Sequence, residues 1–108
     1  MLSVEAVKKK LHKYTREQIR FNEPHFSVRL QLREGKRQDI LEHLRNPTKL
    51  VYVLEQQGTY GDSVYALLFK ESNTQTLKIP VIFMKKTLYV LTFIRRYRPW
   101  QNMIRRKK

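Results

Sequence analysis

The chain has 108 residues and a formal net charge of +14, from 23 Lys and Arg against nine Asp and Glu. A chain of this length holds a single modest hydrophobic core, so we expect one domain over residues 1–108. The charge favours a polyanionic partner such as RNA, DNA or an anionic membrane surface. There is no Cys, which excludes disulfides and thiolate metal sites. The longest apolar runs are far below the roughly 20 residues of a transmembrane helix, and we expect a cytoplasmic protein.

The first predicted element is a helix at the N-terminus. Its apolar residues recur at spacings of three and four, at Val4, Val7, Leu11 and Tyr14. Ser3 is a candidate N-cap for this helix. We expect the helix to extend over residues 1–21, because Pro24 disfavours helical backbone in the residue before it.

The next segment has a pattern that fits two structures. Over residues 26–33 apolar and polar residues alternate strictly, which is the period of a half-buried strand. Pro24, however, suits the first turn of a helix, and His25, Arg29 and Arg33 then fall at i, i+4 and i+8. In either structure these three side chains share one face.

A short helix is predicted from Lys36 to Asn46. It would bury Ile40, Leu41 and Leu44, and Pro47 would stop it. Together with the preceding segment, this makes a helical or strand–helix region over residues 24–46.

Residues 50–95 change to a β pattern. Four runs rich in Val, Ile, Tyr and Phe are separated by short turn sequences, at Leu50–Gln56, Ser63–Lys70, Thr76–Met84 and Thr87–Arg95. They predict an α+β fold in which N-terminal helices pack on a four-stranded antiparallel meander. The strands are apolar on both faces, so we expect another chain, such as a second copy, to cover the face that the helices leave. Pro80 predicts a bulge or an edge position, since it has no N–H to donate.

The C-terminal end of the chain is strongly basic. Glu71 is the last acid, so the final 37 residues carry ten Lys or Arg without a negative charge among them. Cations interleaved with aromatic rings suit single-stranded nucleic acid, because phosphates bind the cations and bases stack on the rings. We expect the end of the last strand and a basic tail over residues 96–108 to form a nucleic-acid interface. Its candidate residues are Arg95, Arg96, Tyr97, Arg98, Trp100, Arg105 and Arg106.

The sequence gives little support for a metal site or a cofactor site. The three His residues have no Cys or paired carboxylates at metal-ligand spacing, and the three Gly form no phosphate-binding cluster. We therefore expect neither a metal nor a cofactor. Metal-free RNA cleavage needs a base for the 2′-hydroxyl, a cation for the phosphorane and an acid for the leaving oxygen. His25, with Arg29 and Arg33 on the same face, is the candidate catalytic group.

These residues also carry a resemblance. The chain contains the arrangement His25-x-x-x-Arg29-x-x-x-Arg33-x-Gly35, followed by the helix at 39–44, Asn46-Pro47 and the strand at 89–93 with a Thr between apolar residues. This arrangement resembles a widespread uncharacterised prokaryotic domain family. That family is similar in layout to the RelE and BrnT ribonuclease toxins. The resemblance covers roughly residues 25–100. It implies helices packed on an antiparallel sheet, RNA as the substrate class, and an antitoxin as another candidate for the chain that covers the uncovered face.

The predicted function is therefore RNA binding, with metal-independent, toxin-type endoribonuclease activity on single-stranded RNA. One alternative is a non-catalytic RNA- or DNA-binding module that uses the same basic surface. Another is a protein that docks on anionic lipid through its Arg- and Trp-rich tail.

Overall fold

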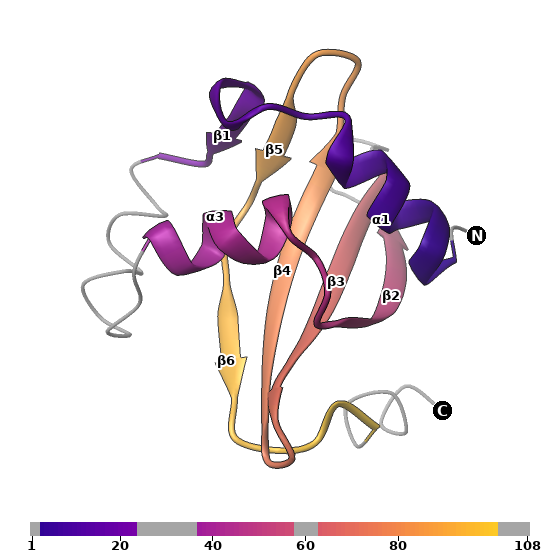
Figure 1. Ribbon diagram of the computed structural model, residues 1–108, viewed down its shortest axis with the longest axis vertical. Helices are drawn as coiled ribbons and strands as arrows, with labels where there is room; N and C mark the ends of the chain where they lie inside the picture. The colour runs from indigo at the N-terminus through magenta and orange to yellow at the C-terminus, as the bar shows by residue number, and fades with distance from the viewer. Residues whose placement is uncertain (1–2, 24–36, 58–62, 102–108) are drawn as a thin grey trace.

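The computed structural model describes residues 3–23, 37–57 and 63–101. They form an α+β fold with a mixed sheet of strand order β1-β5-β4-β3-β2, in which β6 also pairs with β4 (Figure 1). The elements are α1 (Val4–His12), a 3-10 helix (Arg16–Gln18), β1 (Ile19–Phe21), α3 (Arg37–Arg45), β2 (Leu50–Gln57), β3 (Ser63–Ser72), β4 (Gln75–Phe83), β5 (Leu88–Val90) and β6 (Ile94–Arg96). The predicted α+β class is confirmed, but the sheet has six strands and one parallel pairing instead of four antiparallel strands.

The N-terminal helix is shorter than the sequence pattern predicted. The Ser3 hydroxyl accepts a hydrogen bond of 3.1 Å from the backbone N–H of Ala6 and caps α1, which ends at His12. A new turn then begins at Thr15, whose N–H donates to the Gln18 side chain at 2.9 Å. The chain leaves this turn as β1, which pairs in parallel with β5. Residues 19–21 are therefore strand and not helix, because burial of Ile19 in the core and pairing with β5 outweigh the helical spacing.

The second helix and the meander follow the prediction closely. α3 buries Ile40, Leu41 and Leu44. β2 pairs with β3, and β3 with β4, both antiparallel. The predicted last strand, Thr87–Arg95, is divided into β5 and β6, which pair with opposite ends of β4.

Pro80 explains where the last strand is divided. It lies inside β4, between β3 and the β5–β6 edge, and is paired with Ala66. Its carbonyl accepts a hydrogen bond of 3.0 Å from the N–H of Leu91, so its ring nitrogen faces the same neighbour and has no hydrogen to donate. The bulge or edge position that we predicted for Pro80 is therefore wrong: β4 continues through it in regular register with β3, and the irregularity lies in the neighbouring strand, at residues 91–93.

Both helices cover one face of the sheet, which we call the helix face (Figure 1). Their apolar side chains pack there against alternate residues of the strands, and the core includes Val7, Leu11, Ile40, Leu44, Leu67, Phe69, Leu77, Ile79, Val81, Leu88 and Val90. The alternation places the intervening strand residues on the opposite face. Each strand therefore contributes to two different surfaces.

The opposite face is also largely apolar at its centre. Val64, Ala66, Leu68 and Pro80 are buried there within the single chain. The predicted covering of this face by a second copy or an antitoxin stays a prediction. Within the described ranges, no helix combines the length and apolar character needed to cross a membrane.

Candidate nucleic-acid interface

The predicted site residues fall into two groups. His25, Arg29, Arg33, Arg105 and Arg106 lie outside the described residues. The others follow one another from β6 into the C-terminal segment, and the structure places Arg95, Arg96, Tyr97, Arg98 and Trp100. These five do not form one cluster, because β6 alternates and turns Arg95 away from its neighbour Arg96.

Arg95 is turned to the helix face. Its register partner is the core residue Leu77, and its guanidinium donates to Glu71 with distances of 2.8 Å from Nε and 3.3 Å from Nη2. The hydrogen bond to Glu71 raises the pKa of Arg95 above its ordinary value. Arg95 is therefore neutralised within the fold, and its charge is committed to an ion pair.

Arg96 lies on the opposite face, in a row with a second cation. The register pairs Arg96 of β6 with Thr76 of β4, and Thr76 with Lys70 of β3. Neighbouring strands are roughly 4.8 Å apart, which puts the two cationic positions about 10 Å from each other across the row. Both side chains are exposed.

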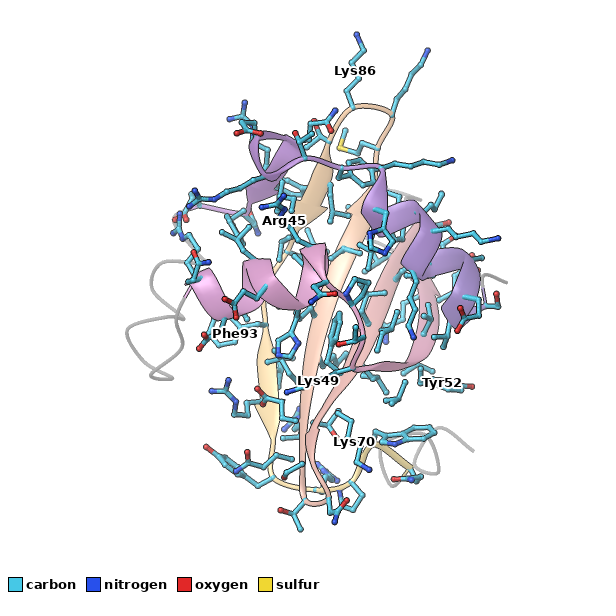
Figure 2. The ribbon with its side chains drawn as sticks, in the orientation of Figure 1. Arg45, Lys49, Tyr52, Lys70, Lys86 and Phe93 are labelled. Atoms are coloured by element: carbon cyan, nitrogen blue, oxygen red, sulfur yellow. The ribbon has the colours of Figure 1, made fainter. Side chains whose placement is uncertain are left out.

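The chain after β6 is held at the same end of the sheet. The hydroxyl of Thr76, which is fully buried, donates a hydrogen bond of 3.0 Å to the carbonyl of Arg98. Trp100 then stacks on Tyr52 of β2, with ring centroids 6.0 Å apart and an interplanar angle of 24°. Tyr52 and Lys70 lie towards the same end of the molecule (Figure 2).

Charge is segregated between the two faces of the sheet. Every charged side chain that the described strands place on the opposite face is a cation, and these are Arg20, Lys70, Lys78 and Arg96. Both acids of the strands, Glu55 and Glu71, belong to the helix face. We use the name cationic face for these four cations together with Tyr52, Arg98 and Trp100, which lie at one end of the sheet. Tyr97, with 76% of its surface exposed, follows Arg96 directly.

A separate open cavity of about 770 Å³ lies beside α3. The ionisable residues that line it are Arg16, Asp39, Glu42, His43, Arg45, Lys49 and Glu71. Because this lining contains both acids and bases, the cavity does not share the single sign of the cationic face.

His43 is the histidine among the described residues that line this cavity. Its side chain is 15% exposed, its ring lies 5.0 Å from that of Phe69, and its Nε2 is 3.8 Å from Oε2 of Glu71. Burial lowers the pKa of His43 below its ordinary value, with the nearby Glu71 carboxylate opposing that shift. The imidazole is therefore in its neutral, proton-accepting form near pH 7.

Sequence reasoning missed the partner of this histidine. The carboxylate beside its Nε2 is that of Glu71, which comes from β3 and also binds Arg95. No local pattern signals a contact between residues this far apart in sequence. Within residues 3–23, 37–57 and 63–101, no three His, Asp or Glu are grouped so that they could hold a metal ion.

No protein-family model, curated protein or solved structure matches this chain. The resemblance to the toxin-like family therefore stays a prediction.

Proposed function

We propose that the protein binds single-stranded RNA through the cationic face. The observation that carries this proposal is the segregation of charge, in which the only charged side chains that the described strands place on that face are Arg and Lys. A surface of one sign binds phosphates and releases their condensed counterions.

Aromatic side chains beside the cations favour a single strand over a duplex. Bases in a duplex are stacked on one another, whereas the bases of a single strand can stack on protein rings. The exposed ring of Tyr97 follows Arg96 directly, and the Tyr52–Trp100 stack lies at the same end. Phosphates would bind Lys70 and Arg96 while bases stack on Tyr97 and on Trp100.

The test is the salt dependence of binding to a labelled single-stranded oligonucleotide, followed by fluorescence anisotropy. If about five phosphates are neutralised, the logarithm of the affinity should fall with the logarithm of salt concentration at a slope near −3.5. Each phosphate contact contributes about 0.7 log units of affinity per decade of salt concentration. The double variant Lys70→Gln/Arg96→Gln removes two contacts, so it should flatten the slope by about 1.4 and weaken binding about 25-fold at roughly 0.1 M salt.

A matched control is the double variant Lys9→Gln/Lys86→Gln. It removes the same charge from exposed positions in α1 and in the turn between β4 and β5, outside the cationic face and outside the lining of the cavity beside α3. Equal losses in the two double variants would assign the binding to net charge and not to this face. No binding by the wild-type protein at low salt would refute the proposed function itself.

RNA cleavage is the second candidate function, and the cavity beside α3 supports it. A neutral imidazole at His43 faces an open cavity whose rim carries Arg45 and Lys49, so a proton acceptor and phosphate-binding cations occur together. The sequence offers His25 for the same role, with Arg29 and Arg33 to stabilise the phosphorane. A metal-independent endoribonuclease would use one of these two histidines as base or acid, and a non-catalytic RNA- or DNA-binding module would use neither.

A further inference from the structure

The end of α1 meets the turn between β4 and β5 at the far end of the molecule from Lys70. Tyr14, just after α1, donates a hydrogen bond from its hydroxyl to the carbonyl of Met84 in this turn. Its ring stacks on Phe83 with centroids 6.3 Å apart. Lys86, in the same turn, projects from the opposite end of the molecule to Lys70 (Figure 2).

A second cavity, of about 300 Å³, opens between these two elements. We call it the α1–turn cavity, and it is lined by Lys10, Lys13, Tyr14, Gln18, Phe83, Met84 and Lys85. Its three charged lining residues are all lysines, in contrast to the mixed lining of the cavity beside α3. Its size is at the lower end of the range for small-molecule pockets.

Interactions among the described residues account only in part for the lysines of this cavity. Lys10 lies over the Phe83 ring, with Nζ 4.8 Å from the centroid. Lys13 and Lys85 have no carboxylate partner within the part of the chain that the structure describes. Cations at the end of a helix gain about 0.3–1 kcal/mol from its dipole, which applies to Lys13 but not to Lys85 in the turn. Their mutual repulsion would be relieved by a bound anion.

The apolar part of the lining is compatible with a base. Met84 is 51% exposed and adaptable in shape, and it lines the cavity together with Tyr14. Burial raises the pKa of Tyr14, so its hydroxyl stays protonated and continues to donate to Met84. The cavity therefore combines a fixed aromatic wall with cations at its rim.

We propose that the α1–turn cavity binds one nucleotide of single-stranded RNA, with Lys13 and Lys85 on its phosphate and its base against Met84 and Tyr14. This inference rests on the proposed function and adds a second contact at the opposite end of the molecule. One strand that reaches both sites gains affinity, because binding at the first raises the effective concentration at the second. A lipid surface is a poorer fit, since burying one methionine side chain contributes only about 1.5–3 kcal/mol.

The experiment compares two double variants for binding to a labelled oligouridylate of about 15 nucleotides. Lys13→Gln/Lys85→Gln removes one lysine at the end of α1 and one in the turn, both of which line the cavity. Lys9→Gln/Lys86→Gln removes one lysine from each of the same two elements, outside its lining. All four positions are exposed, so circular dichroism and thermal melting should be unchanged.

The cavity-lining variant should bind about 25-fold more weakly at roughly 0.1 M salt, with a slope flatter by about 1.4. The control should lose less than about threefold, because a cation that does not contact phosphate releases no condensed counterion. Equal losses in the two variants, with the wild type still binding, would refute the α1–turn site and leave the cationic face as the proposed site. Loss of sedimentation with phosphatidylserine vesicles in the lining variant alone, with RNA binding unchanged, would replace the nucleotide by a lipid headgroup. If the wild type binds no RNA, both proposals fail.

Discussion

Arg95 reaches across β4 from β6 and donates two hydrogen bonds to the carboxylate of Glu71 on β3, at 2.8 and 3.3 Å. The same carboxylate lies 3.8 Å from the imidazole of His43 on α3. One acid therefore connects two strands and a helix on the helix face. It also keeps negative charge away from the face that we propose for RNA.

Removal of this carboxylate should destabilise the fold. Glu71→Gln keeps the shape of the side chain but removes the charge, and both partners of the pair are only about a fifth exposed (19% and 23%). We expect a loss of about 1–2 kcal/mol in the free energy of unfolding, since a charge-assisted hydrogen bond contributes more than an exposed ion pair. Urea denaturation measures the difference. Glu55→Gln, at an exposed position on β2, is the control and should change stability by less than about 0.5 kcal/mol.

His43 should make stability dependent on pH. Because burial lowers its pKa, the folded state binds the His43 proton less readily than the unfolded chain does. The contribution of the neutral ring is therefore present above about pH 6.5 and is lost as pH falls through the lower, folded-state pKa. The neighbouring Glu71 and Asp39 oppose this shift, and Lys49 reinforces it.

The measurement is the melting temperature as a function of pH between about 5 and 8. His43→Gln should flatten the decline on the acid side, whereas His12→Gln, which changes an exposed histidine of α1, should leave it unaltered. Superimposable pH profiles for wild type and His43→Gln would contradict the assignment.

Tyr97 and Trp100 should differ in their effects on stability. The exposed Tyr97→Ala variant should melt like the wild type but lose roughly 1–3 kcal/mol of RNA-binding free energy, if one base stacks on the ring. Trp100→Ala should lose RNA affinity and also stability, because it removes the stack on Tyr52. The pair of variants is compared by anisotropy and by thermal melting. An unaltered RNA affinity in Tyr97→Ala would exclude that ring from the interface.

The fold could be predicted largely from local patterns. α3 and the strands from β2 to β4 follow from periodicity and from turn residues, which act over a few positions. β1 could not be predicted, because its three residues become a strand only by pairing with β5, far along the chain. Tertiary pairing of this kind overrides local preference.

The register of the sheet is needed to assign the predicted site residues to one face or the other. Consecutive strand residues point to opposite faces, so Glu71 and Arg95 meet on the helix face while their neighbours Lys70 and Arg96 lie on the cationic face. Sequence alone predicted the basic and aromatic character of the C-terminal segment, but it treated Arg95 and Arg96 as equivalent. The partner of each cation depends on which residues lie opposite in adjacent strands, and those residues come from distant segments.

RNA cleavage can be tested with two histidine variants in a chelating buffer. If His25 is the acid or base, the activity should survive chelation and show a pH inflection near 6.5. His25→Ala should then lower the rate about 10²–10⁴-fold with RNA affinity nearly intact, because proton transfer stabilises only the transition state. Arg29→Ala should lower both rate and affinity, since its guanidinium would bind phosphate in the ground state as well.

His43→Ala discriminates between the two candidate bases. Full activity in His25→Ala together with loss in His43→Ala would place the reaction in the cavity beside α3, where the neutral imidazole faces Arg45 and Lys49 at the rim. A melting curve of His43→Ala must accompany the assay, because the ring also packs on Phe69 and an unfolded variant would lose activity for another reason. Stable RNA binding without fragments, at protein excess and between about pH 5 and 9, would identify a non-catalytic module, since a histidine base of ordinary or lowered pKa would be deprotonated and active within that range.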